Sequence, residues 1–245
     1  TMPSGRIKAL QTGLPRGAPF DTAMLEGLRI SSALAYDYVK SGWLEKLGRG
    51  VFMFAGDELT REATLPFLES RMPGLHVAGK TALAWHGYRH HVSARETIIL
   101  WGDRRATLPT WFTDCFPARY SSSRLFEDSL EPGFGIAALP DSPEGPQVSG
   151  PERALLEMLS EVGVHQELDE ARDIMEGVRQ LRMRYLKRLL QSCRQVKAVR
   201  LCVVWARELA LPWAEPARQA AAGKMGSGRW VARLKNGHTL VLKPE

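Results

Sequence analysis

The order of short elements in the first sixty residues is the feature that most restricts how this chain can fold. Apolar residues at helical spacing, preceded by capping residues and followed by Gly or Pro, predict helices over residues 7–13, 22–28 and 31–41. Two apolar runs, 43–47 and 51–54, flank a glycine-containing turn, which is typical of a β-hairpin. Helix, helix, turn, helix and hairpin is the order of a winged helix-turn-helix.

In such a module the second helix of the pair presents side chains to DNA bases, and the hairpin lies near the sugar–phosphate backbone. Helical spacing places Leu34, Ala35, Tyr38 and Val39 on the inner face of the helix that begins after Ser31. Asp37 would be repelled by phosphate, so its position on the outer face argues against DNA binding. The predicted DNA-binding residues of this module are Ser31, Ser32, Tyr36, Lys40, Lys46 and Arg49.

Charge is unevenly distributed along the chain, whose net charge is +6. Residues 179–200 carry eight Lys or Arg and no acid, whereas residues 72–170 have a net charge of −6. The basic stretch could contact phosphate through Arg182, Lys187 and Arg188, or it could be a solvated helix face that pairs with the acidic region. Both interpretations stay open at this point.

The chain beyond residue 72 mixes predicted strands and helices, so we expect an α+β protein with domains 1–72 and 73–245. Strands are predicted at 97–101 and 135–139, with a turn-rich loop over 140–146 between the second strand and a helix that begins near Pro151. Further helices are predicted over 168–193, with a break near Gly177, and over 196–209. A last hairpin is predicted from 230–234 and 239–242 around Asn236-Gly237.

One motif favours a different class of protein. Residues Gly74 to Thr81 match G-x-x-x-x-G-K-T, the loop that binds phosphate in nucleotide hydrolases. A working loop needs a buried strand just before its first glycine, and residues 68–73 do not form one. A nucleotide-binding protein that uses Lys80 and Thr81 is therefore the alternative from another class.

Other signs of catalysis or metal binding are weak. His86, His90 and His91 lie close in sequence, but no carboxylate or cysteine nearby completes a set of metal ligands. No catalytic motif of a hydrolase is found, so we expect no enzyme activity, no cofactor and no metal. Three unclustered cysteines and the lack of a long apolar run predict a cytoplasmic protein without a membrane partner.

Four segments of the chain resemble the AbiEi antitoxin family. They are Ile30–Phe52 with its core Tyr38-Val39-Lys40-Ser41-Gly42-Trp43-Leu44-Glu45, His76–Gly87, Gly150–Glu157 and Val196–Leu201. The resemblance implies a winged-helix DNA reader joined to a larger mixed α/β antitoxin domain. It also implies a transcriptional autorepressor of a type IV toxin–antitoxin, or abortive-infection, system of phage defence.

Members of this family bind double-stranded DNA at inverted repeats in their own promoter, and their partner is a nucleotidyltransferase toxin that they counter without a stable complex. Two further interpretations remain open. The chain could be a solitary winged-helix regulator without a toxin, or an interaction module whose helical part docks a partner enzyme.

Overall fold

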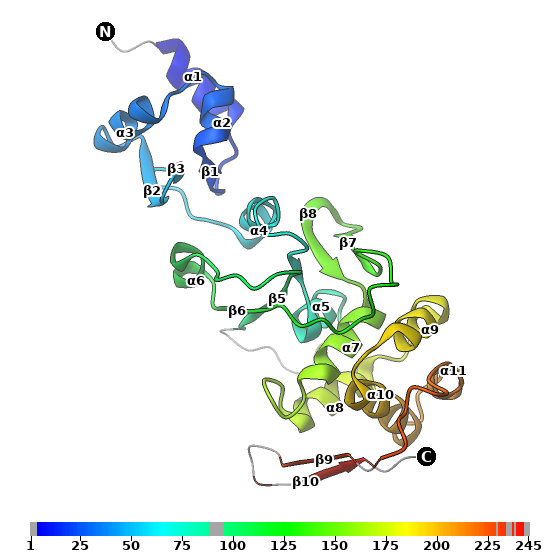
Figure 1. Cartoon of the computed structure of the whole chain (residues 1–245). Helices are drawn as coiled ribbons and strands as arrows, with labels where there is room; N and C mark the ends of the chain where they lie inside the picture. The colour runs from blue at the N-terminus through cyan, green and yellow to red at the C-terminus, as the bar shows by residue number, and fades with distance from the viewer. Residues whose placement is uncertain (1–3, 89–95, 229, 234–236, 238, 243–245) are drawn as a thin grey trace.

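Two clusters of buried apolar side chains organise the structure. The computed structural model describes residues 4–88, 96–228, 230–233, 237 and 239–242. The first cluster is drawn from residues 10–54, and the second from residues 65–221. Figure 1 shows the first cluster's elements at one end of the molecule, with α4 (Arg61–Glu69) following them. Leu65 and Leu68 of α4 belong to the second cluster. The division at residue 72 stays a prediction.

The first cluster is enclosed by three helices and a small antiparallel sheet in the order β1-β3-β2. The elements are α1 (Ser4–Gly13), β1 (Phe20–Asp21), α2 (Thr22–Gly27), α3 (Ser32–Lys40), β2 (Leu44–Gly48) and β3 (Val51–Phe54). This is the winged helix-turn-helix that the sequence predicts, with β2 and β3 as the wing. The added strand β1 was not predicted, because two residues show no periodicity.

Local capping fixes the helix pair. Asp21 accepts a hydrogen bond from Met24 N at 2.8 Å at the start of α2, and Ser31 accepts one from Leu34 N at 3.3 Å at the start of α3. The turn between the two helices passes through Arg29, whose φ of 59° is in the left-handed region. These contacts set where α3 begins and so which of its side chains face outward.

The second cluster is built on a five-stranded sheet covered by helices. Its strands, in the order β6-β5-β4-β8-β7, are β4 (His76–Val77), β5 (Ile98–Trp101), β6 (Ala118–Ser121), β7 (Ile136–Leu139) and β8 (Ser142–Ser149). β5 runs parallel to β6 and β4 runs parallel to β8, while the β4–β5 and β7–β8 pairs are antiparallel. The sheet is therefore mixed, and together with its helices it gives the chain the predicted α+β character.

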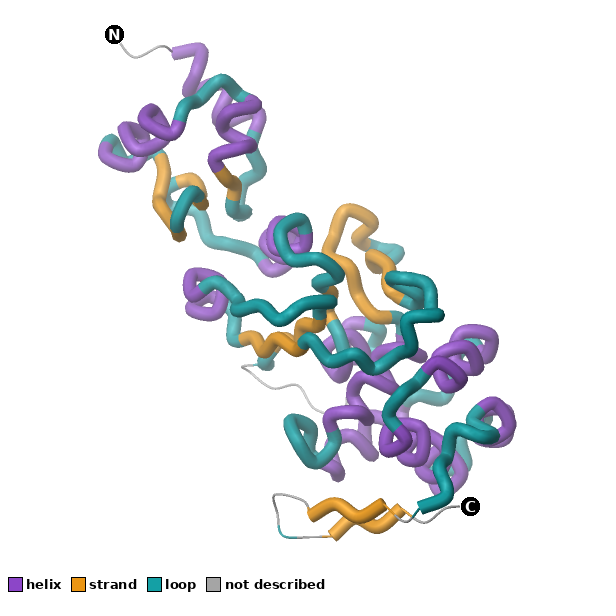
Figure 2. The backbone as a smooth tube through the Cα atoms, in the orientation of Figure 1, coloured by secondary structure: helices purple, strands orange, loops and turns teal. Residues whose placement is uncertain are grey.

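The helices of this part are α5 (Gly79–Trp85), α6 (Thr110–Cys115), α7 (Pro151–Glu161), α8 (Leu168–Gly177), α9 (Met183–Ser192), α10 (Val196–Glu208) and α11 (Ala214–Ala220). The last strands, β9 (Trp230–Arg233) and β10 (Thr239–Leu242), form an antiparallel hairpin. Figure 2 shows α7 to α11 gathered at the end of the molecule away from the winged helix.

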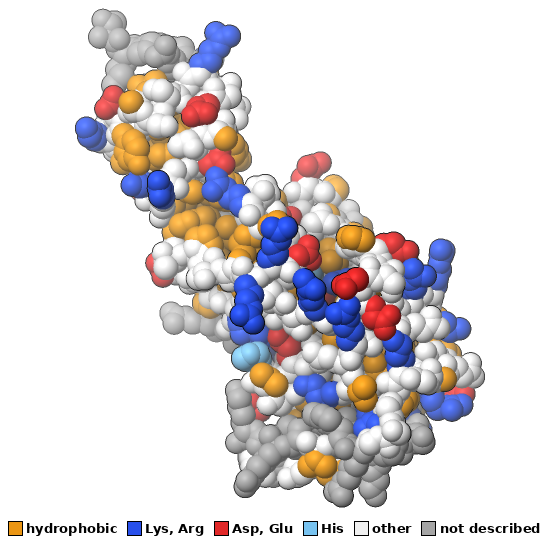
Figure 3. Space-filling model, viewed as in Figure 1, with side chains coloured by type: hydrophobic (Ala, Val, Ile, Leu, Met, Phe, Trp, Pro, Cys, Tyr) orange, Lys and Arg blue, Asp and Glu red, His pale blue; other side chains and the backbone are white. Residues whose placement is uncertain are grey.

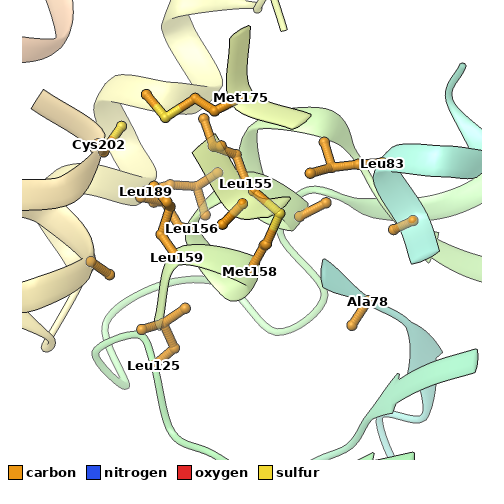
Figure 4. Close-up of a cluster of buried hydrophobic side chains, with 14 of the residues drawn as sticks. Ala78, Leu83, Leu125, Leu155, Leu156, Met158, Leu159, Met175, Leu189 and Cys202 are labelled. Atoms are coloured by element: carbon orange, nitrogen blue, oxygen red, sulfur yellow. The ribbon is translucent and has the colours of Figure 1, made fainter. Parts of the chain in front are cut away.

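Helix α7 lies at the centre of the second cluster. Leu155, Leu156 and Leu159 are fully buried, and α7 packs against α5, α8, α9 and α10. Figure 4 shows these leucines in the same buried cluster as Leu83 from α5 and Leu189 from α9. A helix that is apolar around most of its circumference is buried on most sides, so α7 is the element on which this part of the fold is assembled.

Most predicted elements of the second part are confirmed, including the strands near 97–101 and 135–139, the break near Gly177 and the final hairpin. Asn236 of its turn lies outside the described residues. The loop predicted over 140–146 is wrong, because Ser142 to Ser149 form β8. Ala138 pairs with Gln147 and Leu139 pairs with Ser142, so the residues between Ser142 and Gln147 lie outside the regular ladder. Pro143 and Pro146 are among them and are therefore tolerated.

Candidate nucleic-acid interface

Helix α3 has one buried face and one open face. Ala35 and Tyr38 are buried in the first cluster, and Leu34 and Val39 pack against it. The predicted inner face is therefore confirmed. The predicted DNA-binding residues of the module, Ser31, Ser32, Tyr36, Lys40, Lys46 and Arg49, are all exposed.

The structure brings two of these residues together. Lys46 Nζ of the wing lies 5.2 Å from the centre of the Tyr36 ring, which meets the buried Phe52 ring edge-on at 5.9 Å between centroids. The Tyr36 side chain keeps 42% of its surface exposed. Tyr36 and Lys46 thus form one surface across α3 and the wing, with a phenol hydroxyl and an ammonium group available as hydrogen-bond donors.

The tip of the wing lies against the second part of the chain. A β carbon at Gly48 would lie 3.2 Å from Cδ1 of Trp111 in α6, so only glycine fits this approach without movement. Arg71, just after α4, forms an ion pair with Asp21 of β1 and lies over the Phe67 ring. Figure 3 shows apolar side chains gathered where the two parts meet. These contacts hold the wing close to the second part of the chain. Arg49, in the turn of the wing, remains exposed.

The basic stretch 179–200 does not form one exposed surface, because Arg200 is buried and donates to the carbonyl oxygens of Met225 and Gly226. Arg182 donates to buried Glu152 through its backbone N, Nε and Nη2 at 2.6, 3.1 and 2.8 Å, and this contact raises the pKa of Arg182. Arg188 pairs with Glu131 at 2.9 Å and Arg194 with Asp128 at 3.0 Å. The interpretation that the stretch pairs with the acidic region is thus confirmed for these residues.

Other cations of the stretch remain open to solvent. Arg179, Arg184 and Lys187 are exposed, and none forms an ion pair within the described part of the chain. Figure 3 shows Lys and Arg side chains mixed with Asp and Glu over this face of the second part. A role of the stretch in DNA binding stays a prediction. Of the three residues predicted for it, Lys187 is the one that forms no ion pair with any described residue.

The residues of the nucleotide-binding motif form contacts within the protein. Strand β4 passes through its middle, where a phosphate loop must curl, and a buried carboxylate takes the place of phosphate: Gly79 N donates to Glu157 Oε2 at 3.1 Å. Lys80 Nζ binds Glu170 at 2.8 Å, and Thr81 Oγ1 accepts from Ile99 N at 3.0 Å. The backbone and side chains that would cradle phosphate therefore serve the fold.

From these contacts we expect no saturable binding of ATP or GTP at this loop. Lys80→Ala removes an ion pair whose Lys80 side chain is 27% exposed, so it should lower the free energy of unfolding by at most about 1 kcal/mol. Calorimetric titration of both proteins with each nucleotide is the measurement. Tight binding that Lys80→Ala abolishes would restore the nucleotide-binding alternative.

Buried Glu157 organises a polar network that the sequence did not reveal as a site. Its Oε1 accepts hydrogen bonds from Ser149 Oγ at 3.0 Å and Arg153 Nε at 2.8 Å, and it lies 3.2 Å from His76 Nε2. A glutamate inside the apolar run of α7, four residues after an arginine, was the signal available in the sequence. The network joins β4, β8, α5 and α7, so it is a structural centre.

The histidines and cysteines show no metal chemistry in the described residues. His86 Nε2 lies 3.0 Å from the Ser149 carbonyl oxygen, and burial is the main cause that lowers the pKa of His86. His90 and His91 lie outside the described residues. No group of three potential metal ligands occurs in the part of the chain that is described. Burial raises the pKa of the Cys193 thiol to about 11, which disfavours the thiolate form that binds metals.

A winged helix with polar and cationic side chains on the open face of α3, the second helix of its helix-turn-helix pair, is typical of transcriptional regulators. Residues 4–94 match the N-terminal domain of the AbiEi antitoxin transcriptional regulators, and residues 95–242 match the family described as transcriptional regulator, AbiEi antitoxin, type IV toxin–antitoxin system. The chain belongs to the AbiEi antitoxin family. This family is regulatory, which agrees with the predicted lack of enzyme activity.

A solved structure shares the fold. The RV2827C protein from Mycobacterium tuberculosis is 16% identical, with a TM-score of 0.59 over 93% of this chain and 84% of that one. Among curated proteins, no sequence shows significant similarity to this chain. Within the described residues, no helix is both long and apolar enough to cross a bilayer.

Proposed function

We propose that this chain binds inverted repeats in its own promoter through α3 and the wing and so represses its own operon. The observation that carries the proposal is the open face of α3, where Ser32, Tyr36 and Lys40 are exposed while the opposite face is packed in the core. Hydroxyl and ammonium groups in this arrangement can reach base edges and phosphates.

The antitoxin half of the proposal is supported by family membership. The chain would counter a nucleotidyltransferase toxin encoded beside it without forming a stable complex with it. Co-expression with the product of the adjacent gene tests this half, because growth should be rescued although the two proteins do not co-purify.

The DNA half is tested by titrating fluorescent duplexes that carry either the chain's promoter repeats or the same bases in scrambled order. We expect binding to the repeats to be at least about a thousandfold tighter than to the scrambled duplex, which is the range of specific regulators. Equal affinity for the two duplexes would contradict the proposal.

The basic stretch makes a separable prediction. Replacing Lys187 and Arg188 with alanine should weaken binding to both duplexes alike and reduce the slope of log K against log salt by up to about one unit per lost phosphate contact. Arg182→Ala is not a clean test of DNA contact, because it leaves buried Glu152 without its partner. An unchanged slope in the Lys187 and Arg188 variants would exclude DNA contact by these residues.

A further inference from the structure

A cavity of about 470 Å³ lies at the edge of the five-stranded sheet, apart from the winged helix. Its walls come from Gly102 and Asp103, which follow β5, from residues 122–128, which follow β6, and from His76 and Arg153. Because β5 and β6 are parallel, their carboxyl ends meet at this edge. Ligands of open α/β sheets bind in the crevice outside the carboxyl ends of strands, and the volume is suited to a small molecule.

Two charged side chains in the cavity wall have no ion-pair partner within the described residues. Glu127 pairs with Lys224, Asp128 with Arg194, and Arg153 with Glu157, so these three are neutralised by the protein. Arg124 and Asp103 line the same cavity and form no such pair. The cavity therefore offers one cation and one anion to whatever enters it.

The residues beside Arg124 indicate which ligand chemistry fits. Ser122 and Ser123 precede it and also line the cavity, so two hydroxyl groups and a guanidinium fork come from three consecutive residues. A phosphate has several oxygens that can each accept from such donors, and arginine binds it in a bidentate manner. Asp103, a pure acceptor when ionised, suits hydroxyl groups on the rest of the molecule.

We infer that this cavity binds a small hydroxylated phosphate monoester, the chemistry shared by sugar phosphates and nucleoside monophosphates. Arg124, Ser122 and Ser123 hold the phosphate, and Asp103 accepts from the hydroxyl groups. Ligand binding in this cavity is independent of DNA binding by the winged helix, because none of the cavity residues belongs to that module.

Calorimetric titration of the full chain with ribose 5-phosphate, AMP and inorganic phosphate tests the site. We expect at least one of the two esters to bind with one-to-one stoichiometry, and the tighter of the two shows whether the site prefers a sugar phosphate or a nucleotide. Inorganic phosphate, which lacks the hydroxyl groups, should bind at least about tenfold more weakly. No saturable binding of either ester up to about 10 mM, or phosphate binding as tight as ester binding, would overturn the proposal.

Variants locate the binding. Arg124→Ala should weaken ester binding at least about tenfold, whereas Arg105→Ala, an exposed arginine outside the cavity wall, should leave it unchanged. Asp103→Asn should weaken the esters and spare inorganic phosphate. Ester binding that is insensitive to Arg124→Ala in the folded variant would place the ligand elsewhere and overturn the assignment.

Discussion

Glu157→Ala is expected to lower the free energy of unfolding by about 3–5 kcal/mol, the cost of removing one partner from a buried ion pair. The Glu157 side chain is fully buried, and its two oxygens accept from Ser149, Arg153 and Gly79 N. Alanine leaves these donors without their acceptor in the interior and adds a cavity. Urea unfolding followed by tryptophan fluorescence measures the loss.

The control is Glu176→Ala, a glutamate on the exposed surface of α8, which should change the free energy of unfolding by no more than about 0.5 kcal/mol. Equal effects of the two substitutions would show that the buried carboxylate contributes no more to the free energy of unfolding than an exposed one. Glu157→Gln keeps the shape but not the charge, so it should fall between wild type and Glu157→Ala.

The same carboxylate predicts how stability depends on pH. Burial raises the pKa of Glu157, but the hydrogen bond and charge of His76, the charge of Arg153 and the Gly79 N–H outweigh burial, so its pKa lies below the ordinary value. A carboxylate with a lowered folded-state pKa stabilises the fold above its unfolded pKa of about 4.3, and this contribution is lost as pH falls through the folded pKa. We expect the wild type, but much less so Glu157→Gln, to lose stability steeply below about pH 4.

Local signals explain why the winged helix could be predicted from the sequence. Asp21 and Ser31 cap α2 and α3, and the glycines around Arg49 form the turn of the wing, so each boundary is fixed by residues next to it in the chain. The inner face of α3 follows from helical spacing alone. Charge was a poorer guide, because Arg182 and Arg188 pair with acids that are distant in sequence.

Contacts between distant segments are what the sequence could not reveal. The strand β6 joins the sheet through a parallel pairing with β5, and no short-range pattern specifies such a partner. The approach of Gly48 to Trp111, and the meeting of Asp103 and Arg124 in one cavity, likewise depend on how the sheet is assembled. The G-K-T motif shows the converse case, because the local pattern matches a phosphate loop although Glu157 from a distant helix accepts from its backbone.

Replacing both Tyr36 and Lys40 with alanine is expected to lower the preference for the promoter repeats over scrambled DNA by about a hundredfold. Each good contact to a base edge contributes about 1–3 kcal/mol of discrimination, and these side chains lie on the open face of α3. The double variant should still fold, because Ala35 and Tyr38 on the buried face are unchanged. Fluorescence anisotropy with the two duplexes measures the preference, and a thermal melt checks the fold.

Lys8→Ala provides the matched control, because Lys8 is an exposed cation on α1 and should leave the preference unchanged. The single variants apportion the effect. Tyr36→Ala should reduce the preference without changing the salt slope. Lys40→Ala reduces the preference if the ammonium contacts a base edge, and reduces the slope by up to about one unit if it binds phosphate. A folded double variant with an undiminished preference would show that α3 does not read the bases. The wing, with Lys46 beside Tyr36, would then be the next element to test.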